Sequence, residues 1–264
     1  MKPMSTEEHR TVLLDIASTI HRICDEHGLV YVLQGGSLLG AIRHGGFIPW
    51  DHDFDIMMPR HDYDTLIEHW NEWCDDPKYQ MIAPSLKNCP YFFAKVVDTS
   101  TYVKQIYIAD EYCTGAWVDI FPLDGVHDNV DEIRQKVLHA KRTVYTAITD
   151  TSSGSTPLIK AAKKVVTPIW KRIIKPYEMT YKTDQLMRSQ SAEPTDALAT
   201  FSTTHSFLIC PIDLIFRRTL VPFEDREYWG PADYEAALVN EFGENWRTPM
   251  PDGDHIEKES RYFL

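Results

Sequence analysis

The 264-residue sequence predicts an α+β fold, in which helices pack on a mixed β-sheet and a helical C-terminal part follows. Residues 6–27 and 59–74 repeat apolar side chains at helical spacing. Between residues 79 and 121, apolar residues form short runs of strand length instead. The chain is long enough to bury one large core. We therefore expect residues 1–150 and 151–264 to form one continuous domain.

The first elements follow from side-chain spacing and from glycine. In the helix expected at 6–27, four apolar residues share one face, namely Val12, Ile16, Ile20 and Ile23. Gly28 follows, and glycine readily adopts the left-handed conformation that ends a helix. The next elements are expected in this order: a strand at 30–33, a turn at Gly35-Gly36-Ser37, a short helix at 37–43 and a strand that ends near residue 58.

The later elements complete the sheet and add helices. The helix expected at 59–74 has four core candidates at helical spacing, namely Tyr63, Leu66, Ile67 and Trp70. Strands are predicted at 79–83, 91–97, 102–108 and 117–121. A helix is predicted at 131–148, and the serine-rich run at 151–156 is typical of a linker.

The segment 157–177 reverses the charge of the chain. The formal net charge is −12, yet this segment has no acid and six cations: Lys160, Lys163, Lys164, Lys171, Arg172 and Lys175. Apolar residues alternate with these cations, and Pro168 is expected to kink any helix formed here. One interpretation is a solvated basic helix that covers part of the fold. The other is a surface for anionic lipid or for a polyanionic, lipid-linked acceptor.

The run from residue 33 to residue 60 has the strongest functional pattern. Gly35-Gly36-Ser37 lies where a helix begins, and backbone N–H groups at such a position bind phosphate. Asp53 and Asp55 are two residues apart on an expected strand, so their side chains should project from the same face. Paired carboxylates are oxygen ligands for a hard divalent cation. This pattern predicts phosphoryl or nucleotidyl transfer that depends on a hard divalent cation.

Three cations are candidates for contact with substrate phosphate. Arg43 precedes the second glycine pair, and Arg60 follows the acid strand, so either could act as a forked phosphate donor. Lys95 lies in an apolar strand, where a charge must be paired or must face a cleft. Each could equally be an ordinary surface or paired cation. Five aromatic residues are near enough in sequence to cage a cation, although core packing is the commoner role of such residues: Trp50, Tyr91, Tyr107, Tyr112 and Trp117.

Composition limits the other classes of function. The net charge disfavours general binding to nucleic acid, which needs a basic surface. Five widely spaced cysteines argue against a disulfide framework or a structural zinc site. The first twenty residues lack the apolar core of a signal peptide, and no stretch reaches the roughly twenty apolar residues that span a bilayer. We therefore expect a cytoplasmic protein, with peripheral contact at the inner face of the membrane if residues 157–177 bind lipid.

The segment 33–60 resembles the signature of the LicD family, whose relatives include the fukutin-type transferases. A second block, residues 116–125 (AWVDIFPLDG), and a looser closing block, residues 221–251, are also similar to the family. The resemblance implies a nucleotidyltransferase-like fold, in which a small-residue turn precedes an acid pair and a third acid follows on a later strand. It makes Asp119 that third acid, as a base or further metal ligand.

The same resemblance implies a phosphocholine transferase. The donor would be CDP-choline or a similar CDP-conjugate. The acceptor would be a hydroxyl of a cell-wall or surface glycan, such as teichoic acid or lipopolysaccharide, or of a lipid-linked polymer precursor. Residues 151–264 would complete the acceptor side of the site.

Two alternatives belong to other classes of function. The chain could transfer a nucleotide to another small molecule, a protein or an RNA. It could also be a catalytically silent binding protein of the same fold, although the presence of all three acids argues against that.

Overall fold

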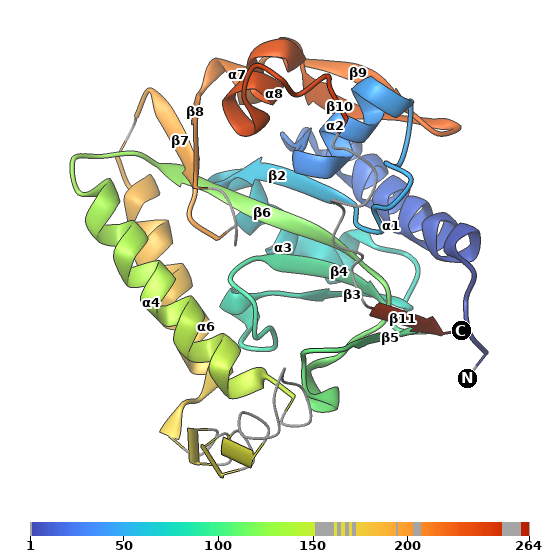
Figure 1. Cartoon of the computed structure of the whole chain (residues 1–264). Coiled ribbons are helices and arrows are strands. Elements are labelled where there is room, and N and C mark those ends of the chain that lie inside the picture. The colour runs from blue at the N-terminus through green and yellow to red at the C-terminus, as the bar shows by residue number, and fades with distance from the viewer. Residues whose placement is uncertain are drawn as a thin grey trace.

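A computed structural model describes most of the chain, namely residues 2–150, 161–162, 165–166, 169–170, 173–193, 195–202, 207–249 and 260–263. Its helices surround a mixed sheet, which confirms the predicted α+β class (Figure 1). The linker predicted at 151–156 lies outside the described residues. So do five cations of the basic segment, namely Lys160, Lys163, Lys164, Lys171 and Arg172.

The central sheet places the acid strand next to the strand of the predicted third acid. Its main path is β1 (Val32–Leu33), β2 (Asp55–Pro59), β6 (Trp117–Gly125), β4 (Ala94–Asp98) and β3 (Tyr79–Ile82). Two further strands extend from β6, namely β7 (Ala197–Thr200) and β8 (Leu208–Pro211). The β2–β6 pair is parallel, and the other pairs of this sheet are antiparallel. The sheet is therefore mixed, as predicted.

Helix α1 (Thr6–His27) has the predicted bounds. It begins with a capping box, in which the Ser5 hydroxyl accepts from Glu8 N–H and the Glu8 carboxylate accepts from Ser5 N–H. It ends at Gly28, whose φ of 68° is left-handed. Ile16 and Ile20 on its inner face are almost fully buried, as the apolar spacing predicts.

Helices α1 and α3 (Arg60–Trp73) cover the central strands. Helix α1 contacts β4 and β6, while α3 contacts β2, β3 and β6. Tyr63, Leu66 and Trp70 of α3 are buried in the same apolar core as Ile16 and Ile20, which confirms their assignment to the core. This core supports the strands that bear the acids.

The remaining helices lie on two sides of the sheet. Helix α4 (Val130–Ile148) packs along α6 (Pro176–Arg188), and Figure 1 shows this pair beside β6 and β7. On the other side, α2 (Gly35–His44) contacts α8 (Tyr234–Phe242) and β9 (Arg218–Phe223). Three single-turn 3₁₀ helices complete the described elements before β7, namely η1 (Pro84–Leu86), η2 (Asp110–Tyr112) and η3 (Ser189–Ser191).

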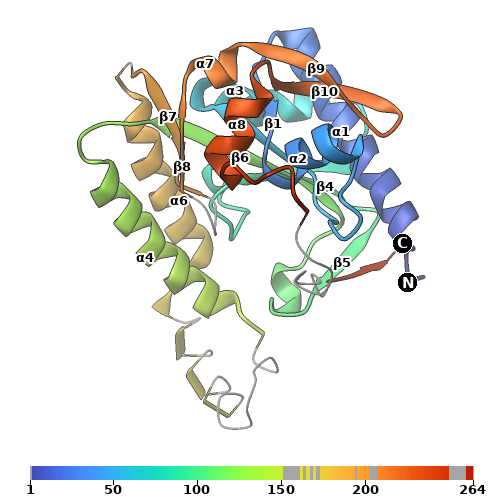
Figure 2. The same cartoon turned by 45° about the horizontal axis from the view of Figure 1, so that its top comes forward.

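The region after residue 150 contributes strands as well as helices. In addition to β7 and β8, it contains α7 (Asp213–Phe216) and a hairpin of β9 (Arg218–Phe223) and β10 (Arg226–Pro231). Figure 2 shows this hairpin and α8 near α2. Because β7 pairs with β6, this region completes the same sheet that holds the acids.

The two ends of the described chain lie close together. Strand β11 (Ser260–Phe263) pairs with β5 (Tyr102–Gln105). Met4 N–H donates to the Tyr262 carbonyl at 2.9 Å, which ties the start of the chain to β11 (Figure 1). Within the described ranges, no helix is long and apolar enough to cross a bilayer.

Candidate active site

Three predicted site residues form one row across three strands. In the parallel β2–β6 pair, Asp55 is the register partner of Asp119. In the antiparallel β4–β6 pair, Asp119 is the register partner of Lys95. Register partners on adjacent strands have neighbouring side chains on one face. The strand register therefore brings Asp55 and Asp119 together, although they are 64 positions apart in the sequence.

The acid pair has the predicted alternation. Phe54 and Ile56 are 1% and 2% exposed, so the strand turns these two residues into the core. Asp53 and Asp55 are only partly buried. Strand β2 begins at Asp55, so Asp53 lies just before it rather than on it. Asp119 N–H donates to the Phe54 carbonyl at 3.0 Å, which joins this entry loop to β6.

The small-residue turn lies directly against the acid strand. Gln34 N–H donates to the Asp55 carbonyl at 3.1 Å, and Asp55 N–H donates to Ser37 Oγ at 2.8 Å. Leu33 is the register partner of Ile56, so β1 delivers the chain to α2 beside β2. These bonds hold the start of α2, the predicted phosphate site, next to the carboxylates.

The second position of this turn lies against a side chain. A Cβ added at Gly36 would overlap Asp51 Oδ2, so any larger residue would have to displace that carboxylate. The side chain of Asp51 thus packs against the start of α2. Gly35 has a φ of 56°, which is left-handed and favours glycine.

Burial and neighbouring charges shift the pKa of Asp119. Burial raises it most, the ammonium group of Lys95 lowers it, and the negative charge of Asp53 raises it. Lys95 Nζ lies 2.9 Å from Asp119 Oδ1, so the two form an ion pair that is 3% and 13% exposed.

Glu241 is a site residue that sequence reasoning missed. It lies on α8, and Gly35 N–H donates to its Oε2 at 3.2 Å. Burial raises the pKa of Glu241 to about 7, although the bond from Gly35 acts in the opposite direction. Its separation of more than 200 residues from Gly35 leaves no local signal in the sequence.

Replacing Glu241 with Gln is expected to stabilise the protein more at pH 8.5 than at pH 5. The folded-state pKa of about 7 exceeds the unfolded value, so the stability gained from proton binding is lost as the pH rises through 7. Gln stays neutral and keeps an acceptor for Gly35. Urea unfolding should show an advantage of up to about 3 kcal/mol at pH 8.5. The exposed Glu244→Gln serves as a control, and an equal effect of Glu241→Gln at both pH values would contradict the shift.

The beginning of α1 borders the acids as well. His9 is 2% exposed, and burial lowers its pKa to about 4. Its ring stacks on Tyr262 at 3.7 Å and lies 6.4 Å from the ring of His52. The Asp53 charge also acts on His9. His9 and His52 are therefore neighbours of the site, and His9 has no sequence signal because it is distant along the chain.

Arg10 shapes the loop that leads to the acids. Its Nη2 donates to the carbonyls of Ile48 and Pro49 at 2.9 and 3.1 Å. A third contact reaches the Asp51 carbonyl at 3.3 Å. One guanidinium group thus fixes the backbone immediately before Asp53.

Two predicted phosphate contacts need correction. Arg60 is 5% exposed, and its donors bind Asp124 twice at 2.7 Å and Asp184 at 2.8 Å. Arg60 follows the last residue of β2. At about 3.3 Å per residue along a strand, this position is roughly 16 Å from Asp55. Arg43 is near the far end of α2 and donates to the Trp246 carbonyl at 3.1 Å. Neither residue is placed at the acid row.

The side chains that the sequence predicts as metal ligands do not surround one common point in the described structure. Among the described residues, no three His, Cys, Asp or Glu side chains are gathered as a metal site requires. Asp119 contacts Lys95 instead. The ligand atoms of the three acids nevertheless fit a metal site, because Mg²⁺ and Mn²⁺ prefer the oxygen ligands that carboxylates supply.

Strand register and the bond from Asp55 to Ser37 thus place the start of α2 and one acid of the pair beside Asp119 of the adjacent parallel strand. Residues 28–172 match the family described as LicD/FKTN/FKRP, nucleotidyltransferase domain. The match covers more than half of the chain, and the chain belongs to this family. The predicted resemblance is therefore confirmed.

Curated relatives agree with this assignment. The lipopolysaccharide cholinephosphotransferase LicD of Haemophilus influenzae is 35% identical over 127 residues, which are 48% of this chain and 47% of the relative. The human ribitol 5-phosphate transferase FKRP is 48% identical over 44 residues, 17% of this chain and 9% of the relative. The mannosyltransferase regulator 4 of Saccharomyces cerevisiae is 29% identical over 66 residues, which are 25% of this chain and 6% of the relative. The chain thus spans less than half the length of these relatives.

Proposed function

We propose that this chain is a metal-dependent transferase that moves phosphocholine, or a related phospho-alcohol, from a CDP-conjugate to a glycan hydroxyl. The observation that carries this proposal is the register of Asp55 with Asp119, joined by Ser37 to the start of α2. This contact supports a phosphate site at the start of α2, beside the three acids. The names of two relatives, a cholinephosphotransferase and a ribitol 5-phosphate transferase, favour a phospho-alcohol as the transferred group.

The first turn of α2 would hold the donor phosphates. Gly35 N–H already donates to Glu241, and Ser37 N–H donates to the Gln34 carbonyl at 3.0 Å. We therefore assign the phosphate contacts to Gly36 N–H and to the Ser37 hydroxyl. That hydroxyl accepts from Asp55 N–H and keeps its own hydrogen to donate.

The three acids would have two different roles, metal binding and proton transfer. Asp53 and Asp55 would hold Mg²⁺ or Mn²⁺, which, when bound, supplies positive charge to the pyrophosphate. Asp119 would orient the acceptor hydroxyl and take its proton as the oxygen attacks phosphorus. Burial supports this role, because it makes the carboxylate of Asp119 a better proton acceptor. The bond from phosphorus to CMP breaks, and CMP leaves.

The acceptor is expected to be a surface glycan. The name of the Haemophilus influenzae relative specifies lipopolysaccharide. Teichoic acid and a lipid-linked polymer precursor are further candidates of the same chemistry, since each offers a sugar or polyol hydroxyl.

Product analysis tests the proposed function. The protein is incubated with Mg²⁺, a glycan acceptor and either CDP-choline or CDP-ribitol, and CMP is measured together with the acceptor mass. The expected result is CMP and a gain of one phospho-alcohol. A gain of a nucleotide would instead identify nucleotidyl transfer. The absence of any product with every donor would favour a silent binding protein.

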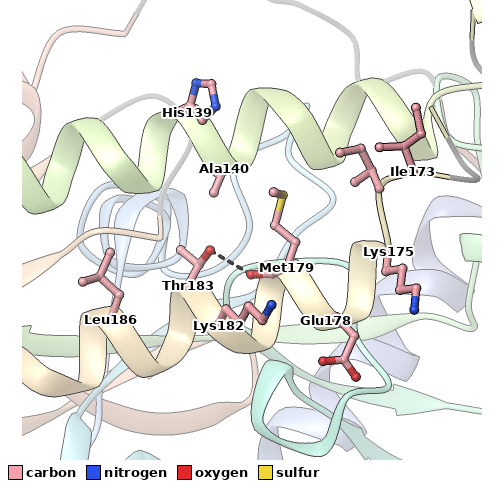
Figure 3. A pocket seen from close by; sticks show the side chains of 10 residues that line it. His139, Ala140, Ile173, Lys175, Glu178, Met179, Lys182, Thr183 and Leu186 are labelled. Atoms are coloured by element: carbon pink, nitrogen blue, oxygen red, sulfur yellow. Dashed lines mark hydrogen bonds between the residues drawn. The ribbon is translucent and has the colours of Figure 1, made fainter.

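We also propose that residues 157–177 contact an anionic membrane from the cytoplasmic side. Five apolar residues in this segment are well exposed, namely Val165, Val166, Ile169, Trp170 and Ile173. Ile173 borders a groove of about 410 Å³ between α4 and α6, shown in Figure 3. Met179 and Leu186 give this groove an apolar lining, and Lys175 lies at one end. Exposed apolar residues beside cations are typical of a peripheral lipid contact.

Replacing Ile169, Trp170 and Ile173 with Gln is expected to abolish sedimentation with vesicles that contain phosphatidylserine. The change removes the apolar contact and keeps every charge. Binding of the unmodified protein should also fall with salt, because charges are screened beyond about 8 Å at physiological ionic strength. Phe216→Gln, at an exposed residue of α7, is the matched control. If the unmodified protein does not sediment with these vesicles at low salt, residues 157–177 do not bind anionic lipid and only cover part of the fold.

A further inference from the structure

Lys95 lies in a closed aromatic box. Its Nζ is 4.0 Å from the ring centroid of Trp117, 4.3 Å from that of Tyr91 and 5.2 Å from that of Phe93. The Asp119 carboxylate lies 2.9 Å away, and Lys95 is only 3% exposed. Ring faces and a carboxylate both attract a cation. The ammonium group is therefore strongly held where it lies.

This box is already filled by the protein's own cation. Tyr91 and Trp117 are among the rings that the sequence offers as a cage for a quaternary ammonium group, yet both face Lys95. A substrate headgroup could enter only if Lys95 withdrew from three rings and an ion pair. Lys95 is also too enclosed for the phosphate contact that its sequence position suggests.

The register gives Asp119 a different neighbour on each side. Lys95 is its partner on β4, and Asp55 is its partner on β2. Among the described side chains, the acids do not gather around one point. Asp119 pairs with Lys95, so the third acid already holds a cation. A second divalent ion at Asp119 would meet the ammonium group at close range and be repelled.

We infer that Lys95 takes the place of a second metal ion, so that the site binds one divalent cation and not two. This inference rests on the proposed function, because it requires Asp53 and Asp55 to bind that cation. Lys95 is then a positioning residue. It holds Asp119 by a fixed charge and leaves a single metal site on the β2 side of the row.

Manganese titration of the full chain tests the inference. Mn²⁺ is added in steps, and bound ions are counted by electron paramagnetic resonance and by calorimetry. The unmodified protein should bind one Mn²⁺ with an uncoupled spectrum. Lys95→Met keeps an apolar, flexible chain among the rings but removes the charge. This variant should bind a second Mn²⁺, with the spin coupling of a close pair, or bind the first at least tenfold more tightly.

Two controls separate charge from shape. Lys95→Arg retains the cation and should still bind one Mn²⁺. The double variant Lys95→Met, Asp119→Asn removes both charges, avoids a buried unpaired acid and should also bind one. Circular dichroism confirms that each variant is folded. Even if Lys95→Met fails to fold, two Mn²⁺ ions bound to the unmodified protein would overturn the inference.

The outcomes distinguish the inference from the proposed function. Two coupled Mn²⁺ ions in the unmodified protein would overturn the inference and leave the transferase intact. A folded Lys95→Met variant with unchanged stoichiometry and affinity would overturn it as well. If none of the proteins binds Mn²⁺, the metal requirement of the proposed function fails, and the inference fails with it.

Discussion

Replacing Asp55 with Asn, or Asp53 with Ala, is expected to lower CMP release by on the order of a thousandfold while the fold remains intact. Asp55 begins β2 beside Ser37 and Asp119, so its carboxylate lies where the proposed phosphate site meets the third acid. Asn has nearly the same shape but lacks the charge that a divalent cation requires. The loss should therefore appear in turnover and in Mn²⁺ affinity together.

The fold should not suffer from these changes. The negative charge of Asp53 raises the pKa of Asp119, which means that the two carboxylates repel each other. Removing Asp53 relieves that repulsion, so urea unfolding should show unchanged or slightly higher stability. Asp75, whose side chain is 91% exposed, offers a matched control, since Asp75→Asn should leave turnover unchanged. Full turnover in both site variants would remove Asp53 and Asp55 from the proposed chemistry.

Replacing Arg60 with Leu is expected to destabilise the fold by about 3–5 kcal/mol. The guanidinium group bridges Asp124 of β6 and Asp184 of α6, and both acids are completely buried. Burial alone would lower the pKa of Arg60, but the two acids reverse this effect and raise it. Without Arg60, two buried carboxylates would lose their main cation. The urea midpoint should fall sharply, with little change in the slope of the transition.

A surface pair provides the comparison for Arg60. Arg22 and Glu26 form an i,i+4 bridge of 2.8 Å in which both side chains are well exposed. Arg22→Leu should therefore cost less than about 1 kcal/mol. Adding Asp124→Asn and Asp184→Asn to Arg60→Leu should restore part of the lost stability, because no buried charge is then left unpaired. If Arg60→Leu costs no more than Arg22→Leu, the buried network does not stabilise the fold.

These two experiments test residues at opposite ends of strand β2. Arg60 joins β2 and α3 to β6 and α6, at the end of β2 away from the acids. Asp53 and Asp55 act at the other end of the same strand. One five-residue strand therefore has a structural ion network at its exit and the candidate chemistry at its entrance.

Local pattern predicted much of the fold. Helix α1 has the predicted bounds, and α3 and α4 differ from prediction by one residue at each end or less. Apolar spacing and Gly28 are properties of neighbouring residues, so the sequence reports them directly. The alternation of Asp53, Phe54, Asp55 and Ile56 is equally local, and it correctly predicted which of these side chains enter the core. The family signature was readable for the same reason.

Contacts between distant segments were decided only by the tertiary structure. The strand register paired Asp119 with Asp55 on one side and Lys95 on the other, and packing of α8 placed Glu241 at the start of α2. Arg60 looked like a phosphate ligand because its sequence neighbours are site residues, yet its partners, Asp124 and Asp184, lie 64 and 124 residues away. A charge is satisfied by whatever lies near it in space. Side-chain spacing determined the elements of this protein, and strand register and helix packing decided which charges meet.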